Sequence, residues 1–267
     1  NLRCKMCFQS SMDKMEQPAN RGIMSWDTYR KFLDEIEKNQ LYSIVFASRG
    51  EPLLNPRIDE MIKEAKNRGV LDIKMNTNAT LLTEDMSRRL LKSGLDLLVF
   101  SVDSVDIETY NDIRGTNLEL VQNNIKRFIE IRKNEFPDSK MKIRVAMVIT
   151  KDVEYKREEE IAKAKAYWNG LVDELSCKTE NNFISIYEDI DDLDRNVCNL
   201  LWERVYLWHD GSVNPCDIDY MSSMDLGNIN DSSIQDIWNG DRMNRLREEH
   251  LNNRDRICTV CKNCVGY

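Results

Sequence analysis

Short apolar runs alternate with longer amphipathic segments between residues 26 and 176. The runs, which predict buried strands, cover residues 42–47, 71–76, 95–102, 141–149 and 172–176. The amphipathic segments, which predict helices, cover residues 26–36, 56–68, 84–93, 118–132 and 154–167. Because parallel strands are joined by crossovers that are usually helical, this alternation predicts an α/β fold built on a parallel sheet. We expect it to occupy residues 1–180.

The charge of the chain narrows its classes of partner. The 267 residues carry a formal net charge of −8, with acidic and basic residues mixed along the sequence. This balance argues against electrostatic binding to nucleic acid or to anionic lipid. No apolar run approaches the roughly 20 residues that a membrane helix needs. We therefore expect a cytoplasmic protein with no nucleic-acid partner and no membrane partner.

The cysteines gather at the two ends of the chain. Eight in 267 residues are too few for a disulfide scaffold. In a reducing compartment, thiols spaced two residues apart predict metal ligands rather than crosslinks. Cys177 lies in a predicted strand, and we expect it to be a small buried hydrophobe. The terminal cysteines are Cys4, Cys7, Cys216, Cys258, Cys261 and Cys264, and Cys198 stands alone.

Polar residues follow three successive predicted strands. The strand ends read Ser48-Arg-Gly-Glu-Pro52, Asn76-Thr-Asn78 and Ser101-Val-Asp103. Taken singly, each could be ordinary turn or cap chemistry. Because ligands bind at the carboxyl ends of parallel strands, the three together predict one polar ring. Such a ring suits a ligand that carries both an ammonium group and hydroxyls.

The stretch Cys4-Lys-Met-Cys7, preceded by Asn-Leu-Arg, resembles the end of the Cys-x-x-x-Cys-x-x-Cys signature of radical S-adenosylmethionine (SAM) enzymes. The resemblance implies a partial (β/α) TIM-type barrel and a 4Fe-4S cluster whose open iron takes the amino and carboxylate groups of SAM. It also implies that the first signature cysteine directly precedes Asn1. We therefore expect a fragment that lacks the first barrel strand and is inactive by itself.

The same resemblance extends to the strand ends. Arg49-Gly-Glu-Pro52 is similar to the Gly-Gly-Glu element of this family, with Arg49 in place of the first glycine, and implies that Glu51 holds the SAM ammonium. Arg114 is implied as a partner of the SAM carboxylate, although it could equally be an ordinary surface arginine. Met6 stands where the family has an aromatic residue beside the adenine. The cofactor-binding candidates are Met6, Gly50, Glu51, Asn78, Ser101, Asp103 and Arg114.

The C-terminal part carries a second resemblance. The ordered stretches 198–202, 207–216, 226–229, 234–238 and 258–264 resemble the SPASM or shorter twitch extension, which implies an auxiliary 4Fe-4S cluster. We expect residues 181–267 to hold an acidic linker at 188–194 followed by this domain, with a hairpin turn at Asp210-Gly211 and one helix across 234–246. The implied ligands are Cys198, Cys216, Cys261 and Cys264, with Cys258 as the alternative to Cys264.

These resemblances imply a radical SAM enzyme of oxidoreductase or mutase type. Such an enzyme forms a 5'-deoxyadenosyl radical that abstracts a hydrogen atom from a small polar metabolite (a sugar or aminocyclitol) or from a peptide. A flavodoxin or ferredoxin would supply the electron, and the auxiliary cluster would accept one from the substrate radical or help conduct one away. The alternative is a zinc-stabilised α/β binding protein without radical chemistry, which uses the same cysteines but leaves the polar ring unexplained.

Overall fold

A computed structural model describes residues 1–10, 21–180, 197–252 and 257–264. The predicted acidic linker at residues 188–194 lies outside these ranges. Contacts divide the chain into two units, and we describe each by itself. Unit 1 comprises Asn1–Gln17 and Gln40–Glu180, and unit 2 comprises Pro18–Asn39 and Asn181–Tyr267. No helix in the described part of the chain is long and apolar enough to cross a membrane.

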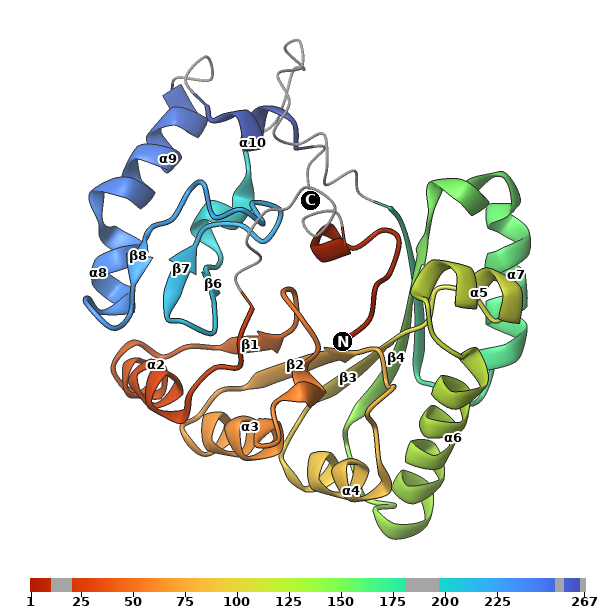
Figure 1. The fold of residues 1–267 in the computed structure, drawn as a ribbon. Helices are drawn as coiled ribbons and strands as arrows, with labels where there is room; N and C mark the ends of the chain where they lie inside the picture. The colour runs from red at the N-terminus through yellow and green to blue at the C-terminus, as the bar shows by residue number, and fades with distance from the viewer. Residues whose placement is uncertain (11–20, 181–196, 253–256, 265–267) are drawn as a thin grey trace. The chain divides into compact units, whose positions relative to one another are not determined.

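Unit 1 is built on a parallel sheet, as the alternating pattern predicted. Its strands follow one another in the order β1-β2-β3-β4-β5, and every neighbouring pair is parallel. Their carboxyl ends therefore lie at one edge of the sheet, which is where the polar ring was predicted (Figure 1). The strands are β1 (Ser43–Phe46), β2 (Asp72–Thr77), β3 (Leu97–Ser101), β4 (Lys142–Ile149) and β5 (Glu174–Thr179).

Helices cover one face of this sheet. Figure 1 shows α3, α4 and α6 on the same side of the strands. Apolar strand residues point into this layer, and the ring of Phe100 meets that of Phe128 with centroids 5.7 Å apart. The crossover helices are α3 (Ile58–Asn67), α4 (Glu84–Lys92), α6 (Leu118–Glu135) and α7 (Arg157–Trp168), with 3-10 turns η1 (Pro52–Leu54) and η2 (Lys151–Lys156).

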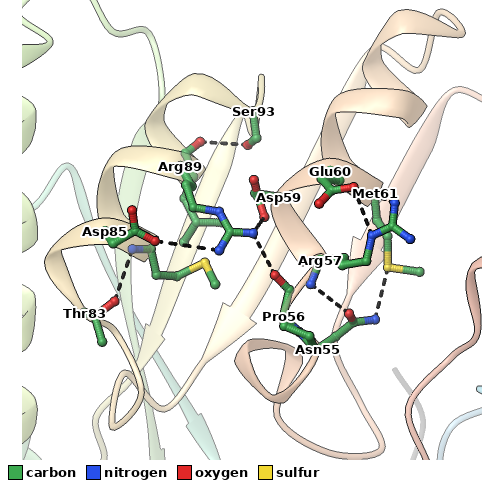
Figure 2. Close-up of polar contacts among 12 residues, drawn as sticks. Asn55, Pro56, Arg57, Asp59, Glu60, Met61, Thr83, Asp85, Arg89 and Ser93 are labelled. Atoms are coloured by element: carbon green, nitrogen blue, oxygen red, sulfur yellow. Dashed lines mark hydrogen bonds and ion pairs between the residues drawn. The ribbon is translucent and has the colours of Figure 1, made fainter.

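A polar contact fixes α4 against the start of α3. Figure 2 shows Arg89 reaching from α4 to this end of the neighbouring helix. Its guanidinium pairs with Asp59 and donates a hydrogen bond of 2.7 Å to the carbonyl of Pro56. The Thr83 hydroxyl caps α4 by accepting from the Met86 amide, which satisfies one of the free donors at the helix start.

The helix α5 (Ile107–Arg114) was not predicted from the sequence. Its N-cap is Asp106, which accepts a hydrogen bond from the Thr109 amide at 2.9 Å. Gly115 ends it with φ of +65°, a left-handed conformation that glycine adopts without strain. The helix is short, so few apolar positions mark its buried side: Tyr110 and Ile113.

Unit 2 contains a small antiparallel sheet. The strand β6 (Tyr206–Leu207) pairs with β7 (Ser212–Asn214), which pairs with β8 (Gly227–Asn228). The first pair is the hairpin predicted at Asp210-Gly211, closed by a 2.9 Å hydrogen bond from the Trp208 amide to the Ser212 carbonyl. The core on one side of this sheet joins Leu201, Val213, Leu226, Ile229, Ile237 and Met243.

The single helix predicted across residues 234–246 is wrong. The structure has two helices there, α8 (Ile234–Asn239) and α9 (Asp241–Asn252), with Gly240 between them in an extended conformation. A Cβ atom at Gly240 would lie 2.8 Å from the carbonyl oxygen of Asp236, so this close turn requires glycine. The remaining elements of the unit are α2 (Trp26–Asn39), η4 (Asn199–Trp202) and α10 (Thr259–Lys262).

By contacts, α2 belongs to unit 2 although it precedes β1 in sequence. Its Phe32 packs against the core that contains Val213, and Lys31 donates a 2.9 Å hydrogen bond to Asn230. The sequence analysis assigned this helix to a domain of residues 1–180, and that division into domains stays a prediction.

Candidate functional site

The residues before and between the first two cysteines form a tight segment, which we call the cysteine loop (residues 1–7). The Cys7 amide donates to the Cys4 carbonyl at 3.1 Å, which turns the chain and leaves both thiols free. Cys4 is buried and Cys7 is half-buried. Met6 lies in the turn between them and is also half-buried.

The end of α5 holds the cysteine loop in place. The Lys5 amide donates to the Ile113 carbonyl at 2.9 Å, and the Lys5 ammonium lies 2.6 Å from the Asp112 carboxylate. The Cys4 thiol points to the Arg114 carbonyl, with the two atoms 3.8 Å apart. A backbone hydrogen bond and an ion pair therefore both connect the loop to the same turn of α5.

Arg114 lies beside Cys4 with little of its side chain exposed, and is therefore not the surface arginine that the sequence analysis kept open. Its side chain is 12% exposed and pairs with Asp103, which is fully buried. One guanidinium nitrogen of Arg114 lies 3.9 Å from the Cys4 sulfur. Burial raises the pKa of the Cys4 thiol, and the positive charge of Arg114 opposes this shift by favouring the thiolate.

Asp103 is fixed from two sides. One carboxylate oxygen accepts from Arg114, and the other accepts from the Val148 amide at 3.0 Å. This carboxylate thus ties the end of β3 to β4 and to α5. Ser101, two residues earlier, is the last residue of β3 and is half-buried.

Glu51 is buried at the end of β1 with three hydrogen-bond donors around it. Its carboxylate accepts from the Thr77 hydroxyl at 2.6 Å, the Asn78 amide at 2.9 Å and the Leu53 amide at 3.1 Å. Burial raises the pKa of Glu51, and these three bonds work against the rise. A carboxylate has about four acceptor positions, so one is left for a further donor such as an ammonium group.

Gly50 and Asn78 complete this side of the site. Gly50 has φ of +121°, a conformation that only glycine adopts readily. A Cβ atom there would meet nothing within 4 Å, so the space beside Glu51 is open. The Asn78 side chain donates to the Asn1 side chain at 2.9 Å. The cysteine loop is therefore bonded to the end of β2 through Asn1 and to the end of α5 through Lys5.

The cysteines of unit 2 form a second group. Cys216 accepts hydrogen bonds from the amides of Ile218 and Asp219, while burial raises its pKa to about 12. Cys258 accepts from the Cys261 thiol and from nearby amides, which lowers its pKa. Cys261 also lies within electrostatic reach of Cys198, and Cys216 within that of Cys264. All five C-terminal cysteines therefore gather in one region.

Hydrogen bonds connect this group, since the Cys258 thiol accepts from Cys261 and backbone amides donate to Cys216. In the described residues, no three histidine, cysteine or acidic side chains converge closely enough to hold one metal ion. Backbone amides that donate to cysteine sulfurs, as at Cys216, are a feature that tunes iron–sulfur clusters.

Two neighbours of this group were missed by the sequence analysis. The Met224 sulfur lies 3.2 Å from the Cys258 sulfur. Asn214 is fully buried, and neither atom of its amide group has a hydrogen-bond partner in the described part of the chain. Its register partner on the hairpin is Tyr206, so both side chains share one face, and Tyr206 lies near Cys216. A buried amide without a partner fits a site that receives a polar group.

A comparison with protein families decides what this arrangement belongs to. Residues 1–163, more than half of the chain, match the model of the radical SAM superfamily. The chain belongs to the radical SAM superfamily. Residues 198–265 match the SPASM model, described as an iron-sulfur cluster-binding domain. The family thus implies a 4Fe-4S cluster with SAM in this radical SAM protein, and the SPASM domain implies auxiliary iron–sulfur binding.

Curated relatives cover the radical SAM protein to different extents. A "Tungsten-containing aldehyde ferredoxin oxidoreductase cofactor-modifying protein" of Pyrococcus furiosus is 28% identical, over 98% of this chain and 84% of the relative. A "Probable GTP 3',8-cyclase" of Methanococcus aeolicus is 33% identical over 49% of this chain and 42% of the relative. The chain therefore spans less than half of that second protein.

Solved structures resemble the radical SAM protein over nearly its whole length. BtrN in complex with AdoMet and 2-DOIA has a TM-score of 0.65 at 18% identity, covering 100% of this chain and 88% of that one. Native anSMEcpe with bound AdoMet has a TM-score of 0.71 at 17% identity, covering 99% and 85%. Streptococcus suis SuiB bound to precursor peptide SuiA has a TM-score of 0.70 at 17% identity, covering 99% and 68%. These identities show the fold alone.

The sequence analysis also missed Lys5 and Asp112, which join the cysteine loop to α5. Lys5 lies between the two cysteines that carried the resemblance, and Asp112 lies two residues before the candidate Arg114. Their opposite charges were visible, but 107 positions separate them, and only the fold brings them together.

Proposed function

We propose that this radical SAM protein abstracts a hydrogen atom from a small polar metabolite or from a peptide. The observation that carries the proposal is the position of the cysteine loop, which is bonded at one end to Asn78 beside buried Glu51 and at the other to α5 beside buried Arg114. Two cysteines thus lie between an acidic group, which can bind the ammonium of an amino-acid ligand, and a basic group, which can bind its carboxylate.

The residues divide into three roles. Cys4 and Cys7 are ligands of the 4Fe-4S cluster. Glu51 receives the SAM ammonium on its remaining acceptor position, and Gly50 leaves the space beside it open. Asn78, Ser101, Asp103 and Met6 position the rest of SAM at the strand ends, with Arg114 near its carboxylate. The bound cluster and SAM supply the 5'-deoxyadenosyl radical, while the protein positions the substrate and excludes water.

The C-terminal cysteines hold an auxiliary 4Fe-4S cluster in this proposal. Cys198, Cys216, Cys261 and Cys264 are its ligands, and Cys258 is the alternative. When bound, this cluster would supply the electron acceptor that makes the reaction an oxidation. A flavodoxin or ferredoxin supplies the electron that starts each turnover. Eight free thiols suit the reducing cytoplasm, which we propose as the location.

The names of relatives support two substrate classes. The relative from Pyrococcus furiosus is named for modifying a cofactor, which is consistent with a small-molecule substrate. The BtrN structure contains 2-DOIA, whereas the SuiB structure contains a precursor peptide. We place the small polar metabolite first, because a curated relative matched over most of both chains is named for modifying a cofactor.

The test begins with anaerobic reconstitution of the full-length protein. Iron and acid-labile sulfide should both be present, and strong reductant with SAM should yield 5'-deoxyadenosine. Candidate substrates labelled with deuterium are then compared, and the true class transfers deuterium to 5'-deoxyadenosine. Zinc without sulfide would instead support the zinc-stabilised binding protein, and deuterium transfer from peptides alone would overturn our preference for a small molecule.

A further inference from the structure

The contacts around Arg114 form a continuous chain from β4 to Cys4. The Val148 amide on β4 fixes one oxygen of Asp103, and the other oxygen holds the guanidinium of Arg114. That guanidinium lies 3.9 Å from the Cys4 sulfur. Because a guanidinium is planar and rigid, fixing it at Asp103 also fixes the direction of its other N–H groups.

The low exposure of Asp103 and Arg114 strengthens their electrostatic effect on Cys4. The Asp103 side chain is fully buried and that of Arg114 is 12% exposed, so little water screens the charge. Arg114 turns one terminal guanidinium nitrogen toward the Cys4 sulfur, 3.9 Å away, while Asp103 is hydrogen-bonded to the Nε atom of the same guanidinium. The pair therefore presents a net positive field to the sulfur.

We propose that Asp103 and Arg114 are a positioning pair that orients Cys4 and raises the reduction potential of the cluster bound there. Reduction adds negative charge to a cluster, and a positive group beside one of its thiolates stabilises the reduced form. This inference rests on the proposed function, because it takes Cys4 as a cluster ligand.

The role differs from binding the SAM carboxylate, which the resemblance implied for Arg114. If Arg114 only contacted SAM, replacing it would change the reduction potential only when SAM is bound. If Arg114 acts on the cluster, replacing it also changes the potential of the protein without SAM. Measurements on the reconstituted protein before SAM is added therefore separate the two roles.

The experiment is a redox titration, followed by electron paramagnetic resonance, of the reconstituted full-length protein without SAM. In Arg114→Gln, the ratio of reduced to oxidised cluster at a fixed potential should fall about tenfold, which for one electron is a midpoint about 59 mV lower. In Asp103→Asn, the positive charge loses its counter-ion, and the same ratio should rise. Opposite shifts from the two partners are the result that a merely structural pair would not give.

Three further variants keep the test decisive. Arg114→Lys keeps the charge, so its midpoint should stay nearer to the wild type than that of Arg114→Gln even if the latter folds poorly. Arg88→Gln removes an exposed arginine that pairs with Glu135 and should leave the midpoint unchanged. Cys4→Ala should lose the cluster, and if it keeps full iron, the proposed ligand is wrong. If Cys4→Ala loses the cluster but neither Arg114→Gln nor Asp103→Asn moves the midpoint, the inference about the pair is overturned.

Discussion

At the scale of single residues, the site depends on charged and polar groups that are buried and already partly satisfied. Glu51 has three internal donors, and Asp103 has a guanidinium and an amide. The sequence predicted that these residues meet at the strand ends, because each follows a buried apolar run. It could not predict which of them pair with one another, since the pairing of Asp103 with Arg114 depends on an unpredicted helix between them.

Glu51→Gln tests the proposed contact with the SAM ammonium. A charge-assisted hydrogen bond contributes about 1.5–3 kcal/mol, so SAM affinity should fall roughly ten- to a hundredfold. Isothermal titration of the reconstituted protein measures it, with a melting curve to verify the fold. Glu60→Gln, which changes an exposed glutamate of α3, is the matched control and should bind SAM as the wild type does. An unchanged isotherm for Glu51→Gln would make this residue a structural cap of η1.

Tyr110 should make the free energy of unfolding depend on pH in the alkaline range. It is fully buried, its hydroxyl has no hydrogen-bond partner among the described residues, and burial raises its pKa to about 12. Its ordinary value is about 10, so between pH 10 and 12 the folded protein keeps a proton that the unfolded chain loses. The free energy of unfolding therefore falls as pH rises through this window.

Tyr110→Phe removes that contribution. From pH 9 to pH 11.5, the wild type should lose about 2 kcal/mol more unfolding free energy than the variant does. Urea unfolding at the two pH values measures the difference. Equal losses in the two proteins would mean that the Tyr110 hydroxyl ionises at its ordinary pKa in the folded state.

At the scale of elements, long periodic segments were predicted and short ones were not. The apolar run at 141–149 predicted β4, and the apolar spacing at 118–132 predicted α6. In both elements these apolar side chains are buried. The eight residues of α5 carry too few buried positions to show a period. The break at Gly240 was missed because one glycine in an apolar helical pattern is often tolerated, whereas here the close Asp236 carbonyl makes it necessary.

Arg89 should matter for the packing of α4 on α3. Its partner Asp59 has a side chain that is only 15% exposed, and Arg89→Gln leaves that carboxylate without its cation. We expect a loss of about 1–2 kcal/mol in the free energy of unfolding. The matched control is Arg57→Gln, since Arg57 pairs with Glu60, and both of those side chains are 47% exposed (Figure 2). It should cost less than about 0.5 kcal/mol. Equal losses from the two variants in urea would contradict the prediction.

At the scale of the whole molecule, the two cysteine groups lie in separate contact units, so each should assemble its cluster independently. Changing both Cys198 and Cys216 to Ala should remove about half of the iron and sulfide, because each cluster needs its own thiolates. Cleavage of SAM without substrate should survive in part, whereas turnover of the substrate should stop. Iron, sulfide and 5'-deoxyadenosine are measured on one preparation of each protein. Full iron in the double variant would show that these cysteines are not ligands.

The contact between α2 and the C-terminal part of unit 2 has a consequence for the order in which the chain folds. The strands of unit 1 pair with their successors, so that sheet can form as the ribosome delivers each strand. The helix α2 emerges before β1, yet it packs on α8, which is synthesised about 200 residues later. The part of its surface that carries Phe32 must therefore wait, uncovered, until the residues of α8 have been made. Nascent chains stalled before residue 234 should be cut by protease at α2, and released chains should resist.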